Sequence, residues 1–326
     1  MTALLEIQGL KTHFKTDDGV VKAVDGVDLH VNKGEVLGIV GESGSGKTIT
    51  ALSAIRLIDS PGEIVAGSIR FEGRDVLAMD KAELTALRGD RISMIFQQPR
   101  VCLNPVKTIG WQITELFSRH RSVSDAEARE TAISVLTAVG IPDAAVRLSS
   151  YPHELSGGQA QRVMIAIALA LRPRVLIADE PTTALDVTIQ AQIMELLKNL
   201  CREMGTALVL VTHDLGVIAE MADRVAVMYA GQIVEQTDVM SLFENPQHPY
   251  TQGLLASMPV LGRRADRLSA IPGSVPKPAD MPPACRFAPR CEARVKHGLT
   301  RCEKEMPDLI QHQGCEVRCW LAMEDV

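Results

Sequence analysis

The octapeptide GESGSGKT, Gly41 to Thr48, constrains the fold of this chain more than any other stretch. It matches the pattern G-x-x-x-x-G-K-[ST], in which a glycine-rich loop holds phosphate groups. Such a loop needs a strand before it and a helix after it. The apolar run VLGIVG (Val36 to Gly41) supplies the strand, and the helical pattern ITALSAIRLI that starts at Ile49 supplies the helix. The motif therefore predicts an α/β fold with a nucleotide phosphate site.

Each residue type in this loop has a physical reason to be there. Glycines let the backbone curl with its N–H groups pointing inward, and the following helix turns its positive end toward the same point. Lys47 is predicted to reach the β- and γ-phosphates, and the Thr48 hydroxyl to ligate Mg²⁺. The other residues predicted to bind the nucleotide phosphates are Gly41, Ser43, Gly44, Ser45 and Gly46.

Alternation of apolar runs with helical patterns extends over residues 1–242. VLIAD (Val175 to Asp179) and ALVLVTH (Ala207 to His213) are continuous apolar runs of strand length, as expected for strands covered on both faces. RVAVMYAGQIVEQ (Arg224 to Gln236) predicts a hairpin that turns near Ala230 and Gly231. From residue 243 the chain becomes rich in proline. We therefore predict an α/β domain that contains the phosphate loop over 1–242 and a small C-terminal extension over 243–326.

Composition limits the class of partner and the location. With a formal net charge of −6 over 326 residues, the chain does not have the basic character of a nucleic-acid-binding protein. The N-terminus lacks the pattern of a secretory signal, and the apolar run VMIAIALAL (Val163 to Leu171) is too short to span a bilayer. The sequence predicts a cytosolic chain unless a membrane partner holds it.

Two further motifs follow the phosphate loop. In LSGGQAQR (Leu155 to Arg162), a serine and two glycines precede a helical pattern, which indicates either a second anion site or simply a helix capped by Ser156. About twenty residues later the VLIADE strand ends in Asp179 and Glu180. Carboxylates at the carboxyl end of such a strand suit Mg²⁺ binding and the activation of water.

Together these motifs resemble the nucleotide-binding subunits of ABC transporters over essentially the whole chain. In chain order they are the phosphate loop, Gln97 in IFQQP, the LSGGQ signature, Asp179-Glu180, the TALD segment (Thr183 to Asp186) and His213 in LVTHD. The resemblance implies a RecA-like core, an antiparallel β subdomain and a helical signature subdomain. It also implies ATP and Mg²⁺ as ligands and ATP hydrolysis as the activity.

Residue roles follow from the same resemblance. Glu180, His213 and Gln97 are implied as catalytic residues, and Phe14 as the aromatic that stacks on adenine. Thr48, Gln97 and Asp179 are the implied Mg²⁺ ligands. Two subunits are implied to sandwich two ATP molecules, each held by one phosphate loop and the other subunit's signature; the implied nucleotide contacts of this second kind are Ser156, Gly157, Gly158, Gln159 and Asp186.

Two stretches resemble one branch of that family, the oligopeptide and dipeptide importers. They are NPQHPYTQGLLASMP (Asn245 to Pro259) and RISMIFQQPRVCLNPVKTIG around Gln97, where Gln98 and Arg100 to Cys102 depart from the branch's usual residues. The implied partners are a second ATPase subunit (a paralogue or a second copy), two permease subunits and an extracytoplasmic solute-binding protein. The implied location is the cytoplasmic face of the bacterial inner membrane. The alternatives are soluble ABC ATPases of DNA repair, translation or iron–sulfur assembly.

Five of the seven cysteines lie in the last 42 residues. Clustered thiols in a reducing compartment favour metal binding over disulfides. The spacing of Cys285, Cys291, Cys302 and Cys319 resembles the cluster-binding tail of dipeptide-type ATPases, which implies a [4Fe–4S] cluster. Four thiolates also suit tetrahedral Zn²⁺, and His297 or His312 is available to complete such a site. Cys315 is surplus to this set.

Overall fold

The computed structural model describes residues 3–17, 19–183, 185–258, 271–276 and 281–323. The chain forms two compact units, each built from several segments. The first unit comprises residues 1–5, 31–36 and 78–211, and the second comprises residues 6–30, 37–77 and 212–326.

The core of the first unit is three parallel strands, β6 (Ile92–Ile95), β7 (Val175–Asp179) and β8 (Ala207–Thr212). Val175 pairs with Ile92 on one side and with Ala207 on the other. Every residue of the three strands is buried, which agrees with their continuous apolar sequences. Parallel strands of this kind bring their carboxyl ends to one edge, where Asp179 ends β7.

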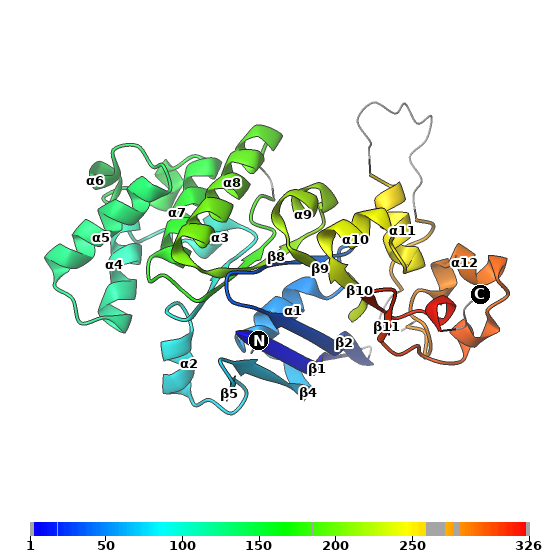
Figure 1. The fold of residues 1–326 in the computed structure, drawn as a ribbon. Helices are drawn as coiled ribbons and strands as arrows, with labels where there is room; N and C mark the ends of the chain where they lie inside the picture. The colour runs from blue at the N-terminus through cyan, green and yellow to red at the C-terminus, as the bar shows by residue number, and fades with distance from the viewer. Residues whose placement is uncertain (1–2, 18, 184, 259–270, 277–280, 324–326) are drawn as a thin grey trace. The chain divides into compact units, whose positions relative to one another are not determined.

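Seven helices of the first unit surround or extend these strands in its described residues. α2 (Lys81–Leu87) and α3 (Pro99–Cys102) are short, and α7 (Gly157–Leu169) and α8 (Val187–Met204) carry the motif-bearing N-termini. Figure 1 shows α4 (Ile109–His120), α5 (Asp125–Ala138) and α6 (Ala144–Arg147) gathered in the teal and green part of the chain, beside α7. α7 is apolar almost all round and accordingly buries eight of its thirteen residues.

The second unit contains an antiparallel sheet of order β2-β1-β4-β5, formed by β1 (Leu5–Thr16), β2 (Gly19–Val31), β4 (Gly62–Phe71) and β5 (Arg74–Asp75). It also contains β3 (Val36–Val40), which leads into the phosphate loop and then α1 (Lys47–Ala54). The predicted helix is shorter than expected at its C-terminal end, because Arg56 adopts a left-handed φ of 53°. β9 (Arg224–Tyr229) lies parallel to β3.

The hairpin predicted at Ala230–Gly231 is present, with β10 (Gln232–Asp238) antiparallel to β9. Helices α9 (Leu215–Met221), α10 (Val239–Glu244) and α11 (Pro249–Ala256) flank it in the chain. The C-terminal extension adds α12 (Glu292–Lys296) and a second hairpin, β11 (Ile310–His312) with β12 (Cys315–Val317). β12 pairs with β10, Val317 lying opposite Glu235, so the extension continues the same sheet.

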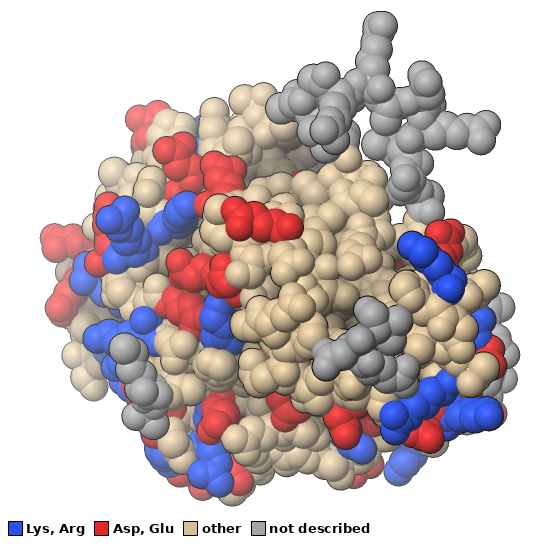
Figure 2. All heavy atoms as spheres, turned by 45° about the vertical axis from the view of Figure 1, so that its right-hand side comes forward, with Lys and Arg blue, Asp and Glu red and all other residues tan. Residues whose placement is uncertain are grey.

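The surface of the molecule carries charged side chains of both signs (Figure 2). On the face shown in Figure 2, acidic and basic side chains are interspersed and form no single continuous basic surface. Among the described residues, no helix has both the length and the apolar character needed to cross a membrane.

Candidate functional site

The phosphate loop joins β3 to α1 and has a shape that only glycine allows at two of its positions. Gly41 has φ 155°, and a Cβ there would lie 2.1 Å from the carbonyl oxygen of Met228. Gly46 has φ 104°, and a Cβ there would lie 2.4 Å from the carbonyl oxygen of Ala23. The loop is therefore held against the backbone of neighbouring strands and curls at the N-terminus of α1, the geometry of an anion cradle.

Lys47 closes this loop from inside. Its ammonium group donates to the carbonyl oxygens of Gly41 (2.7 Å) and Glu42 (3.0 Å), and the residue is 5% exposed. A buried ammonium group beside a helix N-terminus attracts an incoming anion and can donate charge-assisted hydrogen bonds to it. Ser45 is buried and its carbonyl accepts from the Gly231 N–H (2.7 Å), whereas Ser43, Gly44 and Thr48 are exposed. These residues fit a polyphosphate.

Glu180 and Gln97, two of the predicted catalytic residues, are brought into contact in the first unit. The Gln97 side-chain amide donates to the Glu180 carboxylate (2.7 Å), and the Thr183 hydroxyl donates to the same oxygen (2.8 Å). Glu180 has a left-handed φ of 45° and its N–H donates to the Val211 carbonyl (2.8 Å). A non-glycine residue held in this conformation is typical of functional sites. Directly before it, Asp179 is 2% exposed.

The signature motif LSGGQ begins α7 with a capping box. The Ser156 hydroxyl accepts from the Gln159 N–H (3.3 Å), and the Gln159 side chain accepts from the Ser156 N–H (3.1 Å). Ser156 is exposed and Gly157 and Gly158 are half-buried. The helix-cap interpretation of Ser156 is thus confirmed, and the exposed Ser156 and the two half-buried glycines stand at a positive helix end. Contact with nucleotide stays a prediction.

Three other predicted residues lie at element ends. The Asp186 carboxylate caps α8 by accepting from the Ile189 N–H (3.0 Å), and Ala184 of the same motif lies outside the described residues. His213 directly follows β8 and is exposed. Phe14, near the end of β1, is half-buried, and a Cβ on Gly62 would lie 2.5 Å from its ring. One side of the Phe14 ring is therefore covered by the start of β4.

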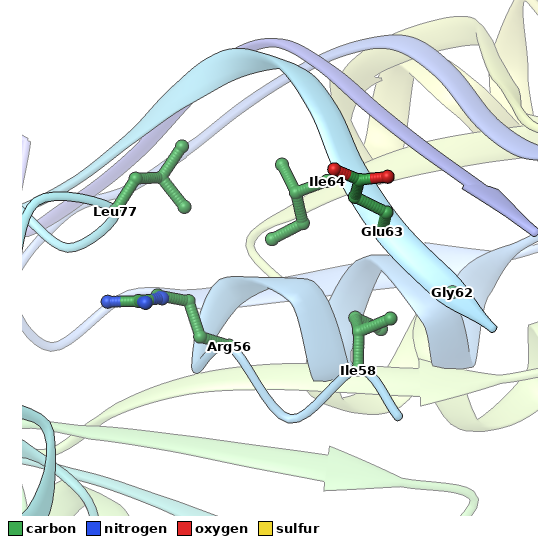
Figure 3. A pocket seen from close by; sticks show the side chains of 6 residues that line it. All are labelled: Arg56, Ile58, Gly62, Glu63, Ile64 and Leu77. Atoms are coloured by element: carbon green, nitrogen blue, oxygen red, sulfur yellow. The ribbon is translucent and has the colours of Figure 1, made fainter. Parts of the chain in front are cut away.

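A hollow of about 340 Å³ lies between the start of β4 and the end of α1, and Figure 3 shows the apolar side chains of Ile58, Ile64 and Leu77 around it. Its two charged members are already engaged. Arg56 donates to the Val76 carbonyl (3.2 Å), and the Glu63 carboxylate accepts from Lys15 (3.5 Å). The hollow therefore has no acid–base pair aimed into it.

The four cysteines predicted as cluster ligands share one region of the extension. Burial, together with the charges of Cys285, Cys291 and Cys302, raises the pKa of the Cys319 thiol to about 12. Burial also raises the pKa of Cys315, but the charges that act on this thiol are those of Glu235 and Glu316. The donor types suit a soft metal site.

These thiols do not form a ready-made ligand shell. No group of three or more His, Cys, Asp or Glu side chains in the described part of the chain is arranged to hold a metal ion. Instead, Cys302 packs in a small apolar core with Ala288, Leu299 and Trp320, and Cys285 borders it. Cys319 packs beside Cys315 and Val317.

Comparison with protein families and known relatives places these features. A family model described as ABC transporter matches residues 24–183, and one described as oligopeptide/dipeptide transporter, C-terminal region, matches residues 234–298. A third, an AAA domain described as putative AbiEii toxin, type IV TA system, matches residues 150–219 and overlaps the first.

Relatives extend the match to full length. The oligopeptide transport ATP-binding protein AppD of Bacillus subtilis (strain 168) is 51% identical over 327 residues, covering 100% of this chain and 98% of AppD. The chain belongs to the family of ABC transporter ATP-binding subunits. Another member, a putative peptide import ATP-binding protein of Brucella abortus (strain 2308), is 51% identical over 97% of this chain and 94% of its own.

A solved structure of the family supports the fold. The dimeric structure of MJ0796, a bacterial ABC transporter cassette, has a TM-score of 0.64 and 31% identity, and the match covers 72% of this chain and 98% of that one. The ABC cassette fold predicted from the motifs is thereby confirmed. Nearly the whole of that cassette is matched, so more than a quarter of this ABC subunit lies beyond it.

Sequence reasoning missed the contacts that this family member makes between its extension and its phosphate loop. The Tyr250 hydroxyl accepts from the Glu42 N–H (2.9 Å), and the Arg290 guanidinium pairs with the Glu42 carboxylate. Arg286, five residues before Cys291, pairs with Asp25 and donates to the Ala230 carbonyl. The only sequence signals are the His-Pro-Tyr segment and two arginines among the cysteines, and neither points to the loop.

Proposed function

We propose that this chain is the ATP-hydrolysing subunit of an ABC importer that carries peptides or related small solutes across the cytoplasmic membrane. The observation that carries the proposal is the 51% identity to an oligopeptide transport ATP-binding protein over the full length of both chains. A match to the C-terminal region of oligopeptide/dipeptide transporters supports the same branch. The identity and the family match both include residues C-terminal to the ATPase cassette. Soluble ABC ATPases of DNA repair, translation or iron–sulfur assembly are therefore a poorer fit.

ATP and Mg²⁺ are the proposed ligands, with Mg²⁺ neutralising phosphate charge during transfer of the γ-phosphoryl group to water. The loop N–H groups and Lys47 bind the phosphates. To do so, the Lys47 ammonium gives up its hydrogen bond to the Gly41 carbonyl and donates to phosphate oxygens instead. Glu180 orients and activates water, and its bonds from Gln97 and Thr183 fix the carboxylate. The proposed Mg²⁺ ligands are Thr48, Gln97 and the buried Asp179, whose hydroxyl, amide and carboxylate oxygens suit a hard cation.

The remaining predicted residues are proposed to act between two subunits. Ser156, Gly157 and Gly158 form the positive N-terminal end of α7, which attracts anions, so we assign them to the nucleotide of the partner ATPase. His213 contacts the γ-phosphate and Phe14 contacts adenine. The ATPase pair works with two permease subunits and a solute-binding protein, as a peripheral assembly on the cytoplasmic face of the membrane.

The extension over residues 243–326 is proposed to form a cysteine-rich module on the ATPase domain of residues 1–242. Cys285, Cys291, Cys302 and Cys319 are the proposed ligands of a [4Fe–4S] cluster, with Zn²⁺ as the competing ion for the same thiolates. The reasons are the family spacing of these four cysteines and the charge interactions of the Cys319 thiol with the other three. A cluster here would staple a small proline-rich segment that has little core of its own.

The test uses the complete transporter in membrane vesicles or nanodiscs. Glu180→Gln is expected to bind ATP, to trap the closed ATPase pair and to lose hydrolysis and peptide uptake together. Thr85→Ala, a change on the exposed face of α2, is the control that keeps both activities. Hydrolysis retained in Glu180→Gln would remove this residue from its role, and an ATPase that does not respond to peptide-loaded binding protein would contradict the proposed cargo.

A further inference from the structure

Glu42, the second residue of the phosphate loop, is contacted twice by the C-terminal extension. Its backbone N–H donates to the Tyr250 hydroxyl (2.9 Å), although 208 residues separate the two in the chain. Its carboxylate accepts from both terminal nitrogens of Arg290, at 2.6 and 3.0 Å, across 248 residues. Backbone and side chain of one loop residue are thus both fixed from outside the loop.

The His-Pro-Tyr segment is built to aim Tyr250. The His248 ring accepts from the Tyr250 N–H (3.0 Å) and so caps α11, and Pro249 occupies its first turn. The buried Glu235 carboxylate accepts from the His248 N–H (2.8 Å). Tyr250 is fully buried, and its ring lies 4.7 Å from that of Tyr229 and 5.4 Å from that of Phe287. The packed ring holds the Tyr250 hydroxyl against the phosphate loop, where it accepts from the Glu42 N–H.

Arg290, directly before Cys291, is equally constrained. Its Nε donates to the Pro272 carbonyl (2.8 Å), and its Nη2 also donates to the Gly273 carbonyl (3.3 Å), so the guanidinium is held in place beside Glu42. The Arg290 side chain is 5% exposed, whereas that of Glu42 is 31% exposed. The guanidinium and the carboxylate carry opposite formal charges and form a salt bridge through two hydrogen bonds. A bidentate pair of this type fixes geometry as well as charge.

A carboxylate on an anion-binding loop weakens anion binding unless a nearby positive charge neutralises it. The loop collects N–H groups, a helix end and Lys47 to attract phosphate, and a free Glu42 charge would repel the same phosphate. The pairing with Arg290 cancels that charge. The bond to Tyr250 meanwhile ties the Glu42 N–H outward and leaves the Glu42 carbonyl facing Lys47.

We propose that Arg290 and Tyr250 are positioning residues for nucleotide binding: Arg290 neutralises Glu42 beside the phosphate site, and Tyr250 fixes the Glu42 peptide. The inference rests on the proposed ATPase function and adds to it a role for the His-Pro-Tyr segment and for the arginine of the cysteine tail. The C-terminal extension thus helps to fix the conformation and the charge of the phosphate loop.

The experiment measures the affinity of the full-length chain for ATP, ADP and AMP by titration calorimetry, with thermal unfolding in parallel. Arg290→Gln exposes the Glu42 charge and is expected to weaken ATP about tenfold, ADP less and AMP least. Glu42→Gln is expected to bind ATP at least as well as the wild type. The double variant is expected to recover the affinity lost in Arg290→Gln, because the repelling carboxylate is gone.

Two further variants separate charge from geometry. Arg290→Lys keeps the charge and is expected to bind ATP within about threefold of the wild type, which provides a readout if Arg290→Gln does not fold. Tyr250→Phe loses one hydrogen bond and is expected to weaken ATP, ADP and AMP by a similar factor of about five. Arg301→Gln, which breaks the exposed pair with Glu305 in the same extension, is the matched control and keeps wild-type affinity.

A double variant as weak as Arg290→Gln would overturn the inference, because the arginine would then serve only to anchor the extension. Equal losses for ATP and AMP in Arg290→Gln would overturn it as well. A wild-type chain that does not bind ATP would instead overturn the proposed function, so the two failures are distinguishable.

Discussion

The His248 ring is buried, and no acidic side chain among the described residues offsets the cost of charging it. This predicts that the stability of the fold depends on pH. Burial, aided by the Arg318 charge, lowers the pKa of His248 from 6.5 to about 3, although a hydrogen bond with the Arg318 backbone opposes the change. The Nδ1 atom already accepts from the Tyr250 N–H, so protonation there would also break the cap of α11. Below pH 6.5 the unfolded chain takes up a proton that the folded chain refuses.

The size of the effect follows from the two pKa values. At about pH 5, an unfolded histidine of pKa 6.5 is almost fully protonated while the folded one is neutral, which costs about 2 kcal/mol of unfolding free energy relative to about pH 8. The loss grows as the pH falls toward 3. The pKa of the buried Glu235, whose carboxylate accepts from the His248 N–H, is raised by burial and acts in the opposite direction. A comparison of variants that all retain Glu235 removes its contribution.

The assay is urea unfolding followed by Trp320 fluorescence in a Trp111→Phe background, where Trp320 is the single tryptophan. His248→Asn keeps an oxygen that can cap α11 but does not titrate. Between about pH 8 and pH 5 the His248 chain is expected to lose about 2 kcal/mol more than His248→Asn. Equal losses in the two chains would refute the reasoning. The absolute stability of His248→Asn is not the readout, because the smaller side chain leaves a cavity at any pH.

Three further changes test the loop and the tail. Gly41→Ala is expected to abolish ADP binding, because its Cβ would lie 2.1 Å from the Met228 oxygen; wild-type affinity in calorimetry would contradict this. Protein purified without oxygen is expected to be brown, with about four iron and four sulfide per chain by chemical assay, whereas a colourless protein with one zinc would disprove the cluster. Cys302→Ser is expected to lower the iron content while Cys315→Ser keeps it; the reverse order would reassign the ligands.

Local patterns were sufficient for the elements that carry the motifs. β7 spans Val175–Asp179 as its apolar run predicts, and the hairpin turns at Ala230–Gly231 because both residues take left-handed conformations there. The end of α1 was missed, since nothing in the apolar pattern signals that Arg56 leaves the helix. Hydrophobic periodicity shows which face of a helix is buried. It does not show where the helix ends, because that depends on how the next segment packs.

The site divides in the same way. The motifs named Gln97 and Glu180 as site residues, but their contact depends on the pairing of β6 with β7, which was not predicted from the sequence. The contacts of Tyr250 and Arg290 with Glu42 bridge more than two hundred residues and have no periodic or spacing signal. Such pairs depend on the final docking of distant segments, which no local rule contains.

The distance in sequence between Glu42 and Arg290 also has a consequence in time. At a synthesis rate of about 5 to 20 residues per second, about 10 to 50 seconds separate the appearance of these two residues at the ribosome. During that interval the phosphate loop exists with its acidic side chain uncompensated and its peptide untethered. Nucleotide binding would therefore mature only when the segment that carries Arg290 has been synthesised and has docked on the loop.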